Sequence, residues 1–493
     1  MSPRSTLLFL LTVLSALALL GALWPAAGVH FAGIQWSLSG PKELLWPKSE
    51  ERVDISAIVS LPTDTTLVDT TATAAIVAAD SARTISFVLD SSALPPLEER
   101  IRLHYPNDDR TVLQPLFAAL RQAAKRSAPI RVLHFGDSQI EGDRITSYLR
   151  HKFQARFGGG GPGLVPIDDI VPSFSIERSL TGEWDRHTIL GKRRKDLLHG
   201  RYGVLTNYAR FTPALPDSVA LDGIDHEAGI RISPLARAYR SVGNYDRCRI
   251  FLGHHRNGVH WELAQEGTTL HSADLEPSDA LQIGEVGGLQ PGVPVDITFR
   301  ADDSPEVYGI SLEASGGVCV DNIGMRGSAA YEFAALDATL LRGMFAALDP
   351  RLVILQYGGN AMPDISSGEQ ASRYGSFFGT VVQRFKRWLP NAAIIVIGPS
   401  DMSIKEGELF ITRPFLEEVN TALKQNCLAN GAVYWDLFTA MGGRNSMVSW
   451  VEAEPPLAAT DYTHFSPQGA RKVGELFWSA FINDFATTSK EQP

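Results

Sequence analysis

Near-continuous apolar runs alternate with amphipathic helical stretches in two parts of this sequence, and this alternation restricts the fold more than any other feature. Four runs have the length and composition of fully buried strands: residues 130–135, 352–357, 392–397 and 433–437. Strands that are buried on both faces read as unbroken apolar runs and belong to parallel sheets covered by helices. The pattern therefore predicts an α/β fold in which a parallel sheet lies between two layers of helices.

The middle of the chain, from about residue 207 to residue 322, has a different pattern. Short alternating runs such as 247–252, 258–263 and 307–312 are separated by Gly, Pro, Asp and Asn. Short strands between frequent turns are typical of a β-sandwich or jelly roll. We therefore expect an all-β insert that splits the α/β domain into two parts.

The N-terminus carries one cation, Arg4, followed by an uncharged and leucine-rich stretch over residues 5–29. About 20 apolar residues suffice to cross a bilayer, and a cation before such a run is typical of secretory signals. The run is long for a cleaved signal peptide, which favours a signal anchor. We expect an exported protein, periplasmic or otherwise extracytoplasmic, that is held at the inner membrane by this segment.

Charge and cysteine content exclude several classes of protein. The net charge is −10 and no long basic run is present, so the sequence gives no support for a nucleic-acid partner. Cys248, Cys319 and Cys427 form no CxxC pair, which argues against a thiolate zinc site. Two alternatives stay open for the cysteines: a disulfide between Cys248 and Cys319 in an oxidising compartment, or three buried free thiols.

Ser138 follows the predicted strand at 130–135 and precedes a predicted helix over 143–157. Open α/β sheets place their functional sites at the carboxyl ends of parallel strands. A serine hydroxyl there becomes a nucleophile when a neighbouring base takes its proton. Taken alone, Gly-Asp-Ser could also be a structural turn with a helix-capping serine and no catalytic function.

Asp461 and His464 form an Asp-x-x-His motif in a loop before the last predicted helix. A carboxylate three residues before an imidazole can hold one ring nitrogen and leave the other free to accept a proton. In a third segment, Gly358-Gly359-Asn360 directly follows the strand at 352–357, where the Asn360 amide can donate to an oxyanion. Each motif alone is weak, and their order and spacing together carry the interpretation.

Together these motifs resemble the SGNH (GDSL-like) hydrolases. The first family block, Gly-Asp-Ser-x-x-x-Gly, stands at 136–142, the third block, Gly-x-Asn, at 358–360, and the last, Asp-x-x-His, at 461–464. The resemblance implies a flavodoxin-like parallel sheet and a catalytic triad of Ser138, His464 and Asp461. It also implies an oxyanion hole made by the Ser138 N–H, the Asn360 amide and the N–H of a glycine from the second block.

For that second-block glycine we select Gly203, with Gly182, Gly191 and Gly200 nearby as alternatives. The sequence departs from the family pattern at Ala361, where many members have Asp after the third-block Asn. That Asp is not a triad member, so the departure changes local hydrogen bonding rather than the expected chemistry.

The β-rich insert makes the chain similar to bimodular peptidoglycan O-acetylesterases, in which a carbohydrate-binding-like jelly roll interrupts the SGNH domain. In the insert, Trp261 and His260 are candidates to contact a sugar, although ordinary strand positions are the plainer interpretation of both. The expected organisation is a signal anchor or signal peptide at 1–28, a tether and extension at 29–111, the first hydrolase part at 112–206, the insert at 207–328, the second hydrolase part at 329–485 and a tail at 486–493.

The expected function is that of an exported serine esterase that removes O-acetyl groups from a cell-envelope or extracellular polysaccharide such as peptidoglycan. Its partners are then an acylated glycan and the membrane, and the triad chemistry requires no metal or organic cofactor. Two alternatives remain: a membrane-anchored polysaccharide O-acetyltransferase that uses the same triad, and a glycan-binding protein with an inactive hydrolase fold.

Overall fold

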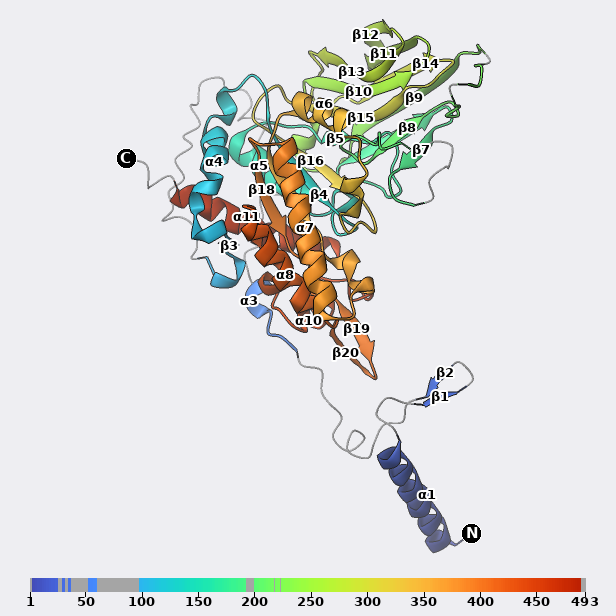
Figure 1. Cartoon of the computed structure of the whole chain (residues 1–493), viewed down its shortest axis with the longest axis vertical. Helices are drawn as coiled ribbons and strands as arrows, with labels where there is room; N and C mark the ends of the chain where they lie inside the picture. The colour runs from blue at the N-terminus through green and yellow to red at the C-terminus, as the bar shows by residue number, and fades with distance from the viewer. Residues whose placement is uncertain are drawn as a thin grey trace. The chain divides into compact units, whose positions relative to one another are not determined.

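A six-stranded sheet organises the hydrolase part of the chain (Figure 1). Its strands, in spatial order, are β16 (Val318–Gly324), β4 (Ile130–Gly136), β17 (Pro350–Gln356), β18 (Ala393–Ile397), β21 (Val433–Trp435) and β3 (Leu103–His104). All neighbours pair in parallel except β3, which runs antiparallel to β21. Numbered along the chain, the five parallel strands have the order 2-1-3-4-5, the flavodoxin-like arrangement expected from the sequence.

The structure is a computed structural model that describes residues 2–24, 29–31, 34–36, 52–59, 97–191, 199–216, 218–221 and 223–488. Most of the predicted tether at 29–111 and the last residues of the predicted tail at 486–493 lie outside the described residues.

Helices cover both faces of this sheet, as the unbroken apolar strands predicted. On one face lie α4 (Gln114–Arg121), α5 (Thr146–Phe157) and α11 (Pro467–Thr487), and on the other lie α6 (Ala338–Leu348), α7 (Gly368–Trp388) and α8 (Leu416–Ala429). Along β4, Val132 packs into the first core while Leu133 and Phe135 pack into the second, because successive strand side chains point to opposite faces. Helix α11 begins with residue types typical of a helix start: Ser466 caps it through the Gly469 N–H, and Pro467 occupies its first turn.

The insert is a sandwich of two antiparallel sheets (Figure 1). One sheet has the order β12 (Thr268–Leu275), β11 (Val259–Gln265), β14 (Val295–Ala301), β9 (His226–Pro234) and β6 (Ile176–Thr181). The other has the order β13 (Ser278–Gly287), β10 (Arg247–His255), β15 (Glu306–Glu313), β8 (Asn207–Arg210) and β7 (Asp185–Thr188), with β5 (Gly163–Val165) paired to β15. Both sheets contribute alternate residues to a single apolar core, as in other β-sandwiches.

The domain boundaries that strand pairing defines differ from those predicted from the sequence. The strands β5, β6 and β7 fall in the range 112–206 but pair with the sandwich, whereas β16 falls in 207–328 but pairs in parallel with β4. Similarly, β3 falls in 29–111 but completes the hydrolase sheet. The predicted limits at 112, 206 and 328 are therefore wrong, because a short apolar strand does not reveal from its own residues which sheet it joins.

A buried ionic network joins the sandwich to the hydrolase sheet. Arg131 on β4 donates through Nη1 to both carboxylate oxygens of Asp321 on β16, at 2.8 and 2.7 Å. Its other amino group contacts Glu313 on β15, which also accepts from Arg247 on β10 at 2.5 Å. A buried arginine without a partner would strongly destabilise the fold. The carboxylates of the sandwich and of the hydrolase sheet therefore stabilise the junction together by pairing with the same arginine.

The N-terminal segment contains helix α1 (Pro3–Leu23) and a two-stranded hairpin of β1 (Val29–Phe31) and β2 (Ile34–Trp36). Among the described residues, α1 is the one helix long and apolar enough to cross a membrane, with a mean hydropathy of 1.8 over Pro3–Leu20 and none of that window buried. This agrees with the predicted anchor, and a cleaved signal peptide passes the same test.

A separate hairpin consists of β19 (Ser403–Glu406) and β20 (Leu409–Thr412).

Candidate active site

Ser138 lies in a tight turn at the carboxyl end of β4. The turn begins at Gly136, where a Cβ atom would come within 3.0 Å of the Gln356 carbonyl oxygen on β17. Asp137 then closes the turn by accepting a hydrogen bond from the Gln139 N–H at 2.9 Å. This places Ser138 between β4 and β17, at the point in the strand order where α/β sheets bind their ligands.

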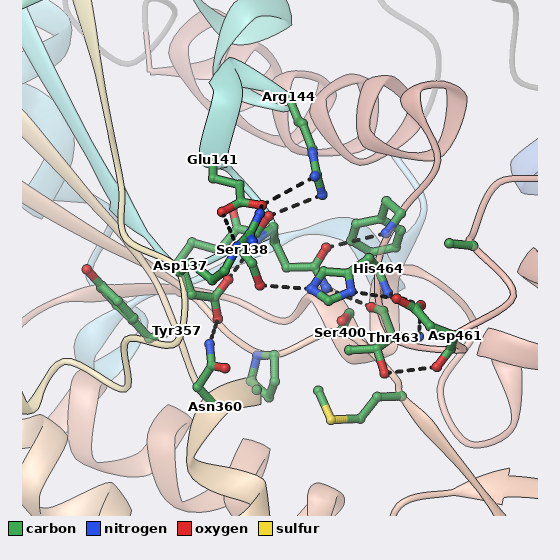
Figure 2. Close-up of a pocket in the computed structure, with 18 of the residues that line it drawn as sticks. Asp137, Ser138, Glu141, Arg144, Tyr357, Asn360, Ser400, Asp461, Thr463 and His464 are labelled. Atoms are coloured by element: carbon green, nitrogen blue, oxygen red, sulfur yellow. Dashed lines mark hydrogen bonds and ion pairs between the residues drawn. The ribbon is translucent and has the colours of Figure 1, made fainter. Parts of the chain in front are cut away.

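The three predicted triad residues form a hydrogen-bonded line in which His464 contacts both Ser138 and Asp461 (Figure 2). The Ser138 Oγ lies 2.9 Å from the His464 Nε2, and the His464 Nδ1 lies 2.8 Å from the Asp461 Oδ2. The other Asp461 oxygen accepts the N–H groups of Thr463 and His464, both at 3.0 Å. The carboxylate thus fixes both the loop and the imidazole ring that it supports.

The environment of Asp461 keeps it ionised. Burial raises the pKa of this carboxyl, but hydrogen bonds from the His464 N–H and ring and from the Thr463 N–H outweigh it and leave the pKa below its ordinary value. An ionised carboxylate at Nδ1 stabilises the imidazolium that forms when Nε2 takes a proton. The arrangement therefore allows Ser138 to be deprotonated by His464.

Gln139 ties the nucleophile turn to the histidine loop. Its side-chain Nε2 donates to the Thr463 carbonyl at 2.7 Å, and its Oε1 accepts from the Phe465 N–H at 3.4 Å. These contacts connect residues more than 320 positions apart in the chain. They fix the separation of the Ser138 and His464 side chains independently of the catalytic hydrogen bond.

Asn360 comes from the turn after β17, in a 3₁₀ segment that spans Gly359–Asp364. Its Nδ2 donates to the Asp137 Oδ2 at 2.9 Å, which fixes the orientation of the amide beside Ser138 (Figure 2). An amide nitrogen carries two hydrogens, so the second remains to donate to an oxyanion. Burial raises the pKa of Asp137 to about 6, against hydrogen bonds from Gln139 and Asn360 and the attraction of His464.

Gly203, the predicted third oxyanion donor, does not lie at this site. It is buried beside Met344 of α6 and Tyr308 of β15, and it is absent from the walls of the pocket that contains Ser138. Gly327 lines that pocket instead, three residues after the end of β16. The prediction of Gly203 is corrected on this ground: β16 is the parallel neighbour of β4, so its carboxyl end opens beside Ser138.

The sequence contained a signal for Gly327. Residues 318–320 form a short apolar run, and Gly324 and Gly327 lie shortly after it, as glycines follow the other strands that contribute to the site. That run falls in the range predicted for the insert, 207–328, because its pairing with β4 cannot be seen in the sequence. Two further pocket residues, Glu141 and Arg326, were also missed.

The residues proposed for sugar contact lie in the sandwich and have different environments. The Trp261 side chain is 1% exposed, packs against Gly284 in the sandwich core and contacts the His271 ring at 4.4 Å. It is therefore unable to stack on a sugar, and its prediction as a contact residue is wrong. His260 lies on the outer face of β11, where it bonds to Asp274 at 2.8 Å and to Glu262 at 3.3 Å.

The three cysteines are buried and free, which removes the predicted alternative of a Cys248–Cys319 disulfide. Cys248 belongs to the sandwich core, whereas Cys319 lies on β16 of the hydrolase sheet. Burial raises the pKa of the Cys319 thiol to about 12, so it is not poised to react. The described part of the chain holds no group of three His, Cys, Asp or Glu side chains arranged for a metal ion.

The triad and Asn360 open into a pocket of about 850 Å³. Its walls include the charged side chains of Glu141, Arg144, Arg326 and Arg413, and apolar groups from Phe174, Pro363 and Met402. A volume of this size accepts a ligand much larger than an acetyl group. An ester carbonyl on a bulky alcohol thus has room to reach Ser138.

A flavodoxin-like strand order with a Ser-His-Asp line and an oriented asparagine amide at its switch point is the arrangement that the resemblance to the SGNH hydrolases implies. The model of the GDSL-like lipase/acylhydrolase family matches residues 291–472. This part of the chain is therefore similar to that family, and the match supports carboxylic ester hydrolysis as the reaction class. The matched range contains Asn360, Asp461 and His464 but not Ser138, which the fold brings to them across the insert.

Three solved structures are similar to this chain to different degrees. One named as a peptidoglycan O-acetylesterase is 21% identical, with a TM-score of 0.57, and the match covers 76% of this chain and 96% of that chain. The acetyl xylan esterase AlAXEase is 17% identical, with a TM-score of 0.26, and covers 33% of this chain and 81% of its own. A family two carbohydrate esterase from Clostridium thermocellum is 10% identical, with a TM-score of 0.23, and the match covers 54% of this chain and 93% of that chain.

The first of these likenesses establishes the two-part fold, and the other two carry no argument because of their low TM-scores. No curated protein matches the chain in sequence.

Proposed function

We propose that this chain is an exported esterase that removes O-acetyl groups from a cell-envelope glycan such as peptidoglycan, through an acyl-enzyme on Ser138. The observation that carries the proposal is the continuous hydrogen-bonded line from Ser138 through His464 to Asp461. A fold that had lost its activity would be under no constraint to keep all three side chains in contact. This argues against the alternative of an inactive, purely glycan-binding protein.

In the first half of the reaction, the Ser138 Oγ attacks the ester carbonyl carbon while the His464 Nε2 takes the hydroxyl proton. Asp461 stabilises the imidazolium through Nδ1. When the tetrahedral intermediate collapses, the bond from the acyl carbon to the sugar oxygen breaks, and His464 returns the proton to that oxygen. Ser138 is left acylated, and the glycan leaves with a free hydroxyl.

Three donors support the negative charge on the carbonyl oxygen in this proposal: the Ser138 N–H, the Gly327 N–H and the Asn360 Nδ2. Among the described residues, no hydrogen-bond acceptor is paired with the Gly327 N–H, and Gly327 faces the pocket. Removing one such donor typically raises the barrier by about 2.7–4 kcal/mol. A water molecule activated by His464 then attacks the acyl carbon, and acetate is released.

The proposed substrate and location rest on further observations. The solved structure with the same two-part arrangement is named as a peptidoglycan O-acetylesterase, and the pocket is large enough for a sugar alcohol next to the acetyl group. The apolar helix α1 supports export and a position at the membrane, where an envelope glycan is available. No metal or organic cofactor takes part in the proposed steps.

The test compares wild-type protein with Ser138→Ala. We expect wild type to hydrolyse 4-nitrophenyl acetate and to release acetate from O-acetylated peptidoglycan more efficiently than from O-acetylated xylan. Because a triad cannot work without its nucleophile, Ser138→Ala should lose at least about 10⁴-fold in kcat while melting at the wild-type temperature.

Two results would contradict the proposal. If Ser138→Ala retained wild-type turnover, the nucleophile would be wrong. If mass spectrometry of the glycan showed a gain of acetyl groups from an acetyl donor, the protein would be the alternative O-acetyltransferase rather than an esterase.

A further inference from the structure

Two neighbouring loops carry the backbone N–H groups of the proposed oxyanion hole. Ser138 belongs to the loop after β4, and Gly327 belongs to the loop after β16. The two strands pair in parallel up to Gly324, which lies opposite Gly136. A covalent path between the two loops runs through the whole sandwich, so their relative position depends on contacts across the strand ends.

The backbone provides the first of these contacts. The Met325 N–H donates to the Gly136 carbonyl at 2.8 Å, and the Asn322 Nδ2 donates to the Ile140 carbonyl at 2.9 Å. Gly324 also approaches the backbone of Glu141 so closely that a Cβ atom there would lie 2.8 Å from the Glu141 Cα. These contacts hold the base of each loop and end two residues before Gly327.

A side-chain contact continues where the backbone contacts stop. The Arg326 Nη2 donates to the Glu141 Oε1 at 2.6 Å, and the Arg326 Nε donates to the Glu141 Oε2 at 2.9 Å. Glu141 is 5% exposed and follows Ser138 by three residues. Its Oε1 also lies 3.4 Å from Arg144, whose other amino group donates to the Ser138 carbonyl at 3.3 Å. Figure 2 shows Glu141 and Arg144 beside Ser138.

We propose that the Glu141–Arg326 ion pair is a positioning device that holds the Gly327 N–H in line with the Ser138 N–H. The proposal rests on the esterase function and on Gly327 as an oxyanion donor. The N–H of Gly327 belongs to the peptide group that joins it to Arg326, so a fixed Arg326 orients that peptide. Gly327 has φ of +78°, and no atom lies within 4 Å of the place where a Cβ would stand, so packing on that side does little to fix the residue.

The form of the ion pair suits this role better than a role in stability. Two parallel N–H···O bonds between a guanidinium and a carboxylate fix direction as well as distance. The Arg326 side chain is 54% exposed, so solvent screens part of its attraction to Glu141 and reduces what the pair adds to the stability of the fold. We therefore expect the loss of Arg326 to appear in turnover, because the oxyanion is bound more tightly than the substrate carbonyl.

The experiment measures kcat and KM for 4-nitrophenyl acetate in Arg326→Ala, Arg326→Lys and Glu141→Gln. We expect Arg326→Ala to lower kcat roughly tenfold to a hundredfold, as for a misplacement of about 1 Å at a reacting centre, and to change KM less than threefold. Arg326→Lys should recover part of the loss. Adding guanidinium ion at millimolar concentration to Arg326→Ala should also raise kcat, because it can occupy the vacated site beside Glu141.

A matched control separates positioning from the general loss of an ion pair. Arg231 donates to both oxygens of Asp296 at 2.8 and 2.6 Å on the outer face of the sandwich, with a similarly exposed side chain. Arg231→Ala should leave kcat and KM unchanged. Its melting temperature should change no more than that of Arg326→Ala, because Asp296 is more exposed than Glu141.

Unchanged kcat in both Arg326→Ala and Glu141→Gln would overturn the proposal and leave the esterase function intact. A parallel fall in kcat and melting temperature that neither lysine nor guanidinium reverses would show a structural role and would also overturn it. If wild type and Ser138→Ala had the same turnover, the esterase function itself would fail, and the positioning role would fail with it.

Discussion

The polar groups at the carboxyl end of the hydrolase sheet and those on the outer face of the sandwich are arranged in opposite ways. At the sheet, Ser138, Asn360 and His464 come from three distant segments and face a common pocket. On the sandwich, polar residues such as His260 pair with their strand neighbours, Asp274 and Glu262, and the large aromatic side chain of Trp261 is buried. The difference indicates that the candidate catalytic groups are concentrated at the sheet, while these sandwich residues contribute to the structure of the sandwich itself.

The largest expected effect tests the structural side of this comparison. Trp261→Ala removes a fully buried indole from the sandwich core and should lower the free energy of unfolding by about 3–5 kcal/mol. The kcat for 4-nitrophenyl acetate, per folded molecule, should stay at the wild-type value. Chemical denaturation and steady-state kinetics on the same preparation measure the two quantities.

Trp261→Phe is the matched milder variant and should give a smaller loss of stability. A fall in kcat for Trp261→Ala under conditions in which it is fully folded would show that the sandwich core transmits structure to the triad.

The next effect tests the catalytic side. Asn360→Ala should lower kcat by about 10²- to 10³-fold with a smaller change in KM, because its amide is expected to bind the oxyanion more strongly than the ground-state carbonyl. Its stability should change by less than that of Trp261→Ala. Steady-state kinetics and thermal melts provide the measurements.

The control for Asn360 is Asn257→Ala, which removes an exposed amide that bonds to Asp302 at 2.7 Å on the sandwich. It should leave kcat unaffected. Equal kinetic losses in both variants would contradict the contrast between the two regions.

A smaller effect concerns Asp137. This residue lies at the active site, and its raised pKa makes the free energy of unfolding depend on pH. Folding raises this pKa from 3.8 to about 6, so between these two values the folded protein binds more protons than the unfolded chain. Stability from this group is therefore present at low pH and is lost as the pH rises from about 4 to 6, by roughly 2–3 kcal/mol. Asp137→Asn does not titrate and should lack this component.

The measurement compares the free energy of unfolding of wild type and Asp137→Asn between pH 4 and pH 7. The stability of wild type relative to the variant should decrease across the lower part of this range and then level off above about pH 6. A difference that does not depend on pH would show that Asp137 has an ordinary pKa in the folded protein.

Local patterns were enough to predict much of the fold. The apolar runs at 130–135, 352–357, 392–397 and 433–437 all form strands of one sheet, and Ser466 with Pro467 marks the start of the last helix. Unbroken apolar runs reveal burial on both faces, and capping residues act within one turn of the helix, so both signals are local. The sequence also placed Ser138, Asp461 and His464 in motifs whose side chains the structure brings into contact.

The tertiary structure alone decided which strands are neighbours. Pairing between strands far apart in the chain assigns β16 to the hydrolase sheet and β5 to the sandwich. As a result, Gly327 rather than Gly203 lines the pocket, and the Trp261 side chain is buried. It also joined Glu141 to Arg326 across 185 positions of sequence. Side-chain periodicity shows whether a residue is buried or exposed on its own strand. Which strand pairs with that strand depends on how the whole chain packs.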